Sequence, residues 1–189
     1  MSVYRDTGVA IARIMSIEAN DGTAKQQWQQ RYEAGFPELR AANPYPLTPQ
    51  ERMTQDAMTR ARLHRELQPL HWHALVAKYS IREAEVVESV LWLIPRVKTP
   101  AHALFRTKCV TAWAIPRKPG VQEGTKTSRR ALPAAFYLLH TWDNEGTPEG
   151  TLRRWRSVTR RWLEDQVTEA YRAADSILQA NGLTVDSAA

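Results

Sequence analysis

The feature that most constrains this chain is a long stretch without proline near the C-terminus, which begins after Thr147-Pro148 and ends at Asn181-Gly182. Proline is favoured at the first position of a helix, and Asn-Gly commonly marks the end of one. Gly150, close to the start, is the one residue between them that strongly disfavours a helix. We therefore predict a single long α-helix, the longest element of the chain.

Arginine and apolar side chains separate onto different sides of the first part of this helix. At about 100° per residue, five arginines share one arc and five apolar residues share the other. The apolar arc comprises Leu152, Trp155, Val158, Trp162 and Leu163, and the basic arc comprises Arg153, Arg154, Arg156, Arg160 and Arg161. We predict that the apolar arc packs into the core, so that the guanidinium groups point outward from a rigid helix.

The positive charge of the chain is concentrated around the same region. The net charge of the 189 residues is +6, but residues 101–161 hold 12 Lys and Arg against 4 Asp and Glu, a surplus of +8. Residues 117–130 contain one proline and two glycines and are predicted to form a flexible basic loop. The candidates in this loop for contact with a phosphate backbone are Lys118, Lys126, Arg129 and Arg130. A basic surface rich in arginine favours binding to a nucleic acid.

The order of elements near the C-terminus predicts a DNA-binding motif. Residues 132–142 are largely apolar, and Asp143-Asn144-Glu145-Gly146 separates them from the long helix. Two helices joined by a short turn form a helix-turn-helix, whose second helix enters the major groove of DNA. We therefore expect the arginines of the long helix to contact double-stranded DNA at guanine edges and phosphates.

A salt-bridged surface is the alternative interpretation for part of the basic arc. Arg160 lies four residues before Glu164, and Arg161 four residues before Asp165, so each pair can meet on a helix. The three upstream arginines have only Glu149 behind them. These three are therefore the better candidates for DNA contact.

The rest of the chain is also predicted to be helical, and no segment alternates clearly enough to indicate a sheet. Thr48-Pro49-Gln50-Glu51 combines an N-cap, a first-position proline and a capping-box glutamate, which predicts a helix to about residue 67. Further helices are expected over residues 3–19, 24–34, 70–79, 81–94 with a start at Ser80, and from Thr99-Pro100 to Pro116.

These elements define a mainly α fold, a helical bundle with a C-terminal helix-turn-helix and a long terminal helix. Residues 1–47 would form an N-terminal helical segment with a Pro-rich connector, and residues 48–116 a helical core. The basic loop over 117–130 would join this core to the helix-turn-helix and long helix of residues 131–189.

No pattern in the sequence predicts a catalytic site, a cofactor or a metal. Cys109 is the single cysteine, which excludes an internal disulfide and the Cys-paired zinc sites, and we expect it in the core. His71 and His73 are two residues apart and would diverge on a helix. The other histidines are expected to cap helices or to lie on the surface: His64, His102 and His140. We therefore expect a binding protein rather than an enzyme.

The sequence also lacks the features of exported or membrane-embedded chains. Charged residues interrupt the N-terminal apolar residues, and no later run approaches the roughly 18 apolar residues of a membrane span. With its single cysteine, the chain is expected to be a cytoplasmic protein with no membrane partner.

Two segments carry a resemblance to a known family. Residues 67–79 read LQPLHWHALVAKY and residues 147–155 read TPEGTLRRW, with the basic loop between them. Together they resemble the phage Q-type transcription antiterminators, including AlpA-like bacterial regulators of a lysis programme. The resemblance covers roughly residues 65–180 and leaves residues 1–45 outside.

This resemblance implies a protein that binds a DNA element near a promoter. It further implies contact with a paused RNA polymerase and its sigma factor, and travel with the polymerase past terminators. Some Q-type proteins carry a zinc-binding insertion, and the single cysteine of this chain implies a zinc-free member.

Two rival functions stay open. The same motif could belong to a phage-type repressor, activator or terminase small subunit, which dimerisation would favour because such proteins commonly read two half-sites. An enzyme acting on nucleic acid would need clustered carboxylates or a metal site near the basic arc. Asp143, Glu145 and Glu149 are the acids nearest to the start of this arc, and their place at the start of a helix explains them better.

Overall fold

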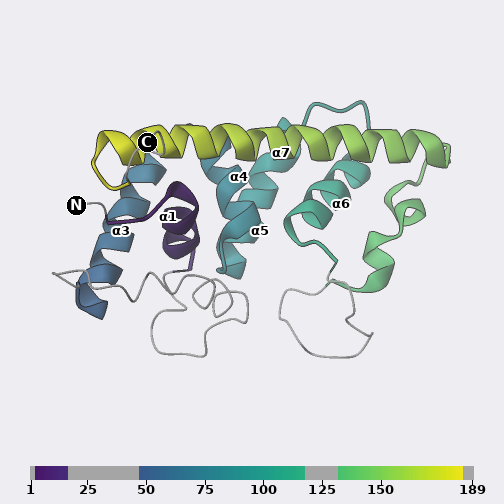
Figure 1. Ribbon diagram of the computed structural model, residues 1–189. Coiled ribbons are helices and arrows are strands. Elements are labelled where there is room, and N and C mark those ends of the chain that lie inside the picture. The colour runs from purple at the N-terminus through teal and green to yellow at the C-terminus, as the bar shows by residue number, and fades with distance from the viewer. Residues whose placement is uncertain (1–2, 17–46, 118–131, 185–189) are drawn as a thin grey trace. The chain divides into compact units, whose positions relative to one another are not determined.

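The computed structural model describes residues 3–16, 47–117 and 132–184, and these residues form α-helices and short 3₁₀ helices without a strand (Figure 1). The prediction of a mainly helical protein is therefore confirmed. By its contacts the chain divides into two compact units, residues 1–66 with 174–189 and residues 67–173. The helix predicted over 24–34 and most of the connector that follows it lie outside the described residues.

The first unit contains α1 (Thr7–Ile14), α3 (Pro49–Glu66) and the end of α7 (Glu149–Ala180). α1 begins after Asp6, whose carboxylate accepts a hydrogen bond from the Val9 N–H at 2.8 Å. It ends earlier than predicted because the Ser16 hydroxyl donates to the Ala12 carbonyl at 2.8 Å and so satisfies one of the carbonyls left open at the helix end. Its predicted apolar residues are buried: Val9, Ile11 and Ile14.

The start of α3 has the predicted capping box. The Thr48 hydroxyl accepts a hydrogen bond from the Glu51 N–H at 3.2 Å, and the Glu51 carboxylate accepts one from the Thr48 N–H at 2.7 Å. These bonds lower the pKa of the Glu51 carboxyl. The helix start is confirmed because the reciprocal pair depends only on residues three apart.

The end of α7 also lies where the sequence predicted it. The Gly182 N–H donates to the Gln179 carbonyl at 2.8 Å, and the Leu183 N–H donates to the Leu178 carbonyl at 2.9 Å. Gly182 has a φ of +65°, which glycine adopts without strain. This pair of bonds is the Schellman motif that terminates many helices.

A buried polar cluster joins α1 to α3 in the first unit. The Tyr4 hydroxyl donates to the Asp56 carboxylate at 2.8 Å, and the Arg13 guanidinium pairs with the same carboxylate at 2.9 Å. Asp56 is only 2% exposed, and burial raises the pKa of the Tyr4 hydroxyl. A buried carboxylate needs such donors, so this cluster makes the packing of α1 on α3 specific.

We predict that Asp56→Ala destabilises the protein by about 2–3 kcal/mol, because Arg13 and the buried Tyr4 hydroxyl both lose their charged acceptor. Tyr4→Phe should cost about 1 kcal/mol, since it removes one hydroxyl and keeps the ring. Urea unfolding followed by circular dichroism measures both. The control is Glu66→Ala at the exposed end of α3, which should stay within about 0.5 kcal/mol of the wild type. Equal stability of Asp56→Ala and the control would contradict the prediction.

The second unit contains four further kinds of helical element before the first part of α7. These are α4 (Pro69–Tyr79), α5 (Glu83–Leu93), η3 (Ile94–Arg96), α6 (Ala103–Ala114), η4 (Ala134–Tyr137) and η5 (Leu139–Trp142), where η denotes a 3₁₀ helix. α4 begins and ends close to its predicted bounds, since Pro69 occupies its first turn and the chain becomes extended at Ser80.

Two helix starts in this unit differ from the predictions. The Ser80 hydroxyl donates to Glu85 at 2.8 Å and accepts from the Arg82 N–H at 3.2 Å, so α5 begins at Glu83 rather than at 81. α6 begins at Ala103 rather than at Thr99-Pro100, because a ring nitrogen of His102 accepts from the Phe105 N–H at 3.4 Å. His102 thus has the capping role that the sequence analysis expected for it.

The α-helix predicted over residues 132–142 is wrong. This segment forms η4 and η5, with Leu138 extended between them at φ −76° and ψ 117°. The Trp142 indole donates to the Phe136 carbonyl at 2.6 Å, and the Thr141 hydroxyl donates to the Leu138 carbonyl at 2.8 Å. These side chains take acceptors that an α-helix would use. The structure therefore does not confirm the helix-turn-helix, although the long second helix is present.

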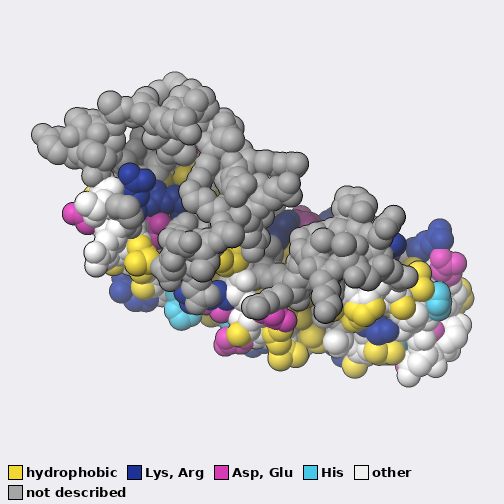
Figure 2. Space-filling view, turned by 90° about the horizontal axis from the view of Figure 1, so that it is seen from below, with side chains coloured by type: hydrophobic (Ala, Val, Ile, Leu, Met, Phe, Trp, Pro, Cys, Tyr) yellow, Lys and Arg dark blue, Asp and Glu magenta, His cyan; other side chains and the backbone are white. Residues whose placement is uncertain are grey.

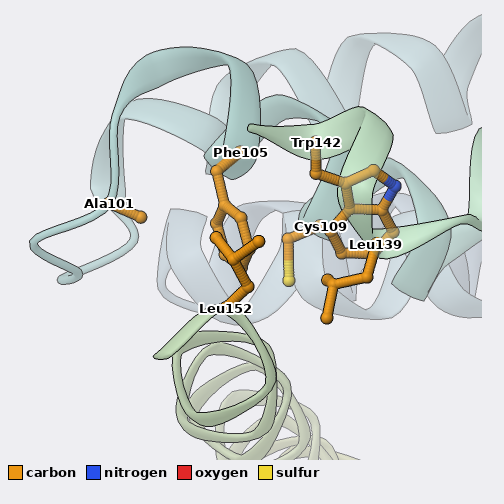
Figure 3. Close-up of a cluster of buried hydrophobic side chains, with 6 residues drawn as sticks. All are labelled: Ala101, Phe105, Cys109, Leu139, Trp142 and Leu152. Atoms are coloured by element: carbon orange, nitrogen blue, oxygen red, sulfur yellow. The ribbon is translucent and has the colours of Figure 1, made fainter. Parts of the chain in front are cut away.

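A hydrophobic cluster holds the start of α7 in the second unit (Figure 3). Phe105 of α6 is fully buried and packs edge-on against Trp142 and Trp155, with ring centroids 5.6 and 5.7 Å apart. Leu152 of α7 points into the same cluster, as does Cys109 of α6. Because a helix is rigid, this anchoring sets the direction of every side chain on the following turns of α7.

Candidate nucleic-acid interface

One side of α7 is buried over its whole length within the second unit. The buried residues are spaced three, four and seven apart, as on one helix face: Leu152, Thr159, Leu163, Val167 and Ala170. Leu152 and Leu163 belong to the predicted apolar arc, and their burial confirms that part of the prediction. Trp155 and Trp162 are half-buried.

The buried side is rotated from the predicted one, toward Arg156. Thr159 is 1% exposed, whereas Val158, which was predicted to be inside, is 53% exposed. Arg156 is only half-exposed, since it lies beside the buried residues. Counting apolar residues placed the centre of the buried face too close to Val158, because the method assigned Thr159 to the polar side.

The five predicted arginines consequently form two rows. Arg154 and Arg161 lie opposite the buried face, two turns apart, and we call them the crest row. Arg153, Arg156 and Arg160 lie along one edge of the buried face, and we call them the flank row. Both rows lie on one continuous helix that the aromatic cluster anchors.

Most of these arginines have no partner within the chain. In the described residues, no hydrogen bond or ion pair engages Arg154, Arg156, Arg160 or Arg161. Arg153 pairs with Glu149 at 2.6 Å, but both side chains are more than half exposed. Such an exposed pair contributes about 0–1 kcal/mol, so Arg153 can exchange it for another anion at little cost.

The salt bridges proposed as the alternative for the basic arc are absent from the described part of the chain. Glu164 turns toward the core, where it pairs with Lys78 of α4 and accepts from the Trp113 indole of α6 at 3.0 Å. Burial raises the pKa of the Glu164 carboxyl, but these donors outweigh it and lower the pKa below its usual range. Glu164 thereby joins three helices instead of neutralising Arg160.

The flank row lies near Cys109 of α6. Burial raises the pKa of the Cys109 thiol to about 11, although the charges of Arg156 and Arg160 act in the opposite direction. Cys109 is 1% exposed, so its predicted place in the core is confirmed. A buried neutral thiol of this kind is not a nucleophile.

The turn before α7 is organised by the Asp143 carboxylate. It accepts hydrogen bonds from the His102 ring at 2.8 Å, the Thr147 N–H at 2.7 Å and the Thr147 hydroxyl at 3.0 Å. Gly146 has a φ of +74°, which completes the turn. Since His102 also caps α6, this one carboxylate joins the start of α6 to the start of α7. Sequence reasoning assigned Asp143 to the helix start but had no signal for the distant His102.

Asp143 gives the position of α7 a pH dependence. Burial raises the pKa of this carboxyl, but its hydrogen bonds from Thr147 and His102 outweigh burial and lower the pKa. A lowered pKa in the folded state stabilises the protein above the unfolded pKa of about 4, and this contribution is lost as the pH falls.

We therefore predict that Asp143→Asn lowers the melting temperature at pH 6–7 relative to the wild type. The difference should shrink toward zero below about pH 3, where Asp143 is protonated in both states. Thermal unfolding at a series of pH values measures it. Asp165→Asn, on an exposed part of α7, is the matched control and should follow the wild type at every pH. A difference for Asp143→Asn that persists unchanged in acid would contradict the prediction.

The other candidate residues do not gather into a site. Lys118, Lys126, Arg129 and Arg130 lie outside the described residues, so the basic loop stays a prediction. The ring of His73 stacks on Trp92 at 4.4 Å and lies 3.1 Å from the Ser89 hydroxyl, roles that a packed histidine fills. Across the described ranges, no group of three or more His, Cys, Asp or Glu side chains could hold a metal ion.

The side of the second unit turned away from α7 presents a different surface. Where it is not covered by grey atoms, Figure 2 shows hydrophobic side chains over α5, α6 and the 3₁₀ helices, with Lys and Arg scattered singly. Exposed apolar residues of these elements include Val87, Leu91, Leu104 and Leu138. The two arginine rows of α7 are therefore the stronger candidate for an anion-binding surface.

None of the helices in the described ranges is both long and apolar enough to cross a membrane. Comparisons with protein-family models and with curated proteins found no match for this chain, so the likeness to the Q-type antiterminators stays a prediction from its sequence.

Proposed function

We propose that this protein is a transcription regulator that binds double-stranded DNA through the first half of α7. The observation that carries the proposal is the set of arginines over residues 153–161, four of which have no partner in the described residues. A protein that keeps four guanidinium groups unneutralised on one rigid helix loses little by exposing them only if an external anion can bind there.

The chemistry of arginine and the size of a helix both suit duplex DNA. An α-helix with its side chains is about 10–12 Å wide, and the major groove is about 12 Å wide. Guanidinium groups bind phosphates bidentately and also match the two acceptors of guanine in that groove. The two rows can thus contact a groove and its bordering backbone together.

The local structure supports α7 as a recognition helix even though η4 and η5 replace the first helix of the predicted motif. Asp143 and the aromatic cluster anchor the start of α7 on α6, so the arginines stand on a rigid element rather than on a loop. Positioning of this kind limits the entropy lost on binding.

We further propose that the regulation is transcription antitermination. This step is supported by the resemblance of residues 67–79 and 147–155 to Q-type antiterminators. In this role the protein would load at a promoter-proximal DNA element, engage the paused RNA polymerase with its sigma factor, and promote read-through of terminators.

The crest row gives the first test. Arg154→Ala combined with Arg161→Ala should weaken binding to a mixed-sequence duplex at least tenfold and lower the salt dependence of binding by about one to two units, since each lost phosphate contact removes about 0.9. Fluorescence anisotropy at several salt concentrations measures both.

The matched control removes the same charge from equally exposed arginines elsewhere. Arg65 on α3 and Arg172 near the end of α7 are about 70% exposed, so Arg65→Ala combined with Arg172→Ala is the appropriate variant. It should bind DNA within about twofold of the wild type. An equal loss in both double variants would show that total charge, and not the crest row, governs binding.

The second test addresses antitermination directly. Added to RNA polymerase paused near the native promoter, the protein should increase read-through of a terminator placed downstream. Read-through should require the DNA element at loading but not next to the terminator. Run-off transcription with and without the element measures this. Promoter binding with unchanged read-through would instead favour a repressor or activator.

A further inference from the structure

Val158 is an exposed apolar residue in the middle of the arginine surface. It is 53% exposed and lies between Arg154 and Arg161, the two residues of the crest row. With spacings of four and three residues, the three side chains share one side of α7. No part of the described chain covers Val158, although a threonine occupies the buried face one residue later.

We propose that the crest of α7 reads DNA bases directly, with Val158 against the methyl group of a thymine and Arg154 and Arg161 on bases to either side. This inference rests on the proposed binding of DNA. The major groove presents one apolar group, the thymine 5-methyl, beside the acceptors of guanine that arginine recognises. A row of arginine, valine and arginine is the complement of such a surface.

The dimensions of α7 agree with this assignment. At 1.5 Å per residue, Arg154 and Arg161 are about 10 Å apart along the helix axis. Base pairs are stacked about 3.4 Å apart, so the crest row spans about three base steps. Val158 therefore lies above a position between the two bases that the arginines contact.

The flank row completes the division of roles. Arg153, Arg156 and Arg160 lie along the edge of the buried face near α6, too far round the helix to face the same base edges as Val158. At the border of the groove they lie where backbone phosphates pass, and phosphate contacts position a protein without reading sequence. The flank row thus supplies affinity, and the crest supplies specificity.

Charge decides between DNA and a protein as the partner of Val158. A hydrophobic protein interface over this valine would also bury Arg154 and Arg161, which have no internal counter-charge. Burying unpaired guanidinium groups is costly, whereas DNA supplies both the anions and the apolar methyl group.

The test uses the full-length protein and a duplex site enriched from random sequence. Each thymine of the enriched site is replaced in turn by deoxyuridine, which removes the methyl group and keeps base pairing. For the wild type, replacement at one position should weaken binding about fourfold, the effect of about one methyl group. For Val158→Ala, the same replacement should leave affinity unchanged, because the contact is already lost.

Leu91→Ala is the matched control, since Leu91 of α5 is 61% exposed and distant in sequence from the crest row. This variant should keep the full sensitivity to deoxyuridine. Val158→Ala should keep the wild-type circular dichroism, because alanine favours a helix more than valine does.

The outcomes separate the inference from the proposed function. If the wild type binds a defined site and no thymine is sensitive, or if the sensitivity persists in Val158→Ala, direct reading by Val158 is overturned while DNA binding stands. If no sequence is enriched but duplex DNA is bound, the crest reads no bases and the inference also fails. If the wild type binds no duplex at all, the proposed function itself is wrong.

Discussion

The packing of Leu152 and Trp155 of α7 around Phe105 of α6 decides the character of this protein's candidate interface. These contacts determine which side of α7 is buried, and a rigid helix transmits that choice to all later turns. With the buried face on Leu152, Thr159 and Leu163, the arginines divide into a crest and a flank. A rotation by one residue would bury Arg156 and return Val158 to the core, so the same sequence would present a different surface.

Polar contacts between distant residues reinforce this orientation. Asp143 joins the cap of α6 to the start of α7, and Glu164 ties the middle of α7 to Lys78 and Trp113. Both are acids that stand next to basic residues in the sequence. Their use in the framework leaves the neighbouring arginines without internal partners and available to an external anion.

Local chemistry was sufficient to predict much of the fold. The capping box at Thr48, the proline at the start of α4 and the Asn-Gly end of α7 depend on residues a few positions apart, and each lies where it was predicted. The predicted helix over 132–142 was wrong because the apolar pattern there does not reveal that Trp142 and Thr141 bond to nearby carbonyls. The start of α6 was misplaced because proline signals suggested Thr99, whereas His102 is the cap.

The sequence by itself determined that the chain is helical, that α7 is one long helix, and that five arginines are clustered within its first turns. Periodicity and caps are local properties, so they are readable without the rest of the chain. Only the tertiary structure decided that Val158 faces outward, that Thr159 faces inward, and that Glu164 serves the core rather than Arg160. The physical reason is that the angle at which a helix is buried depends on partners far away in the sequence, here α4 and α6, and a pattern within one helix does not contain them.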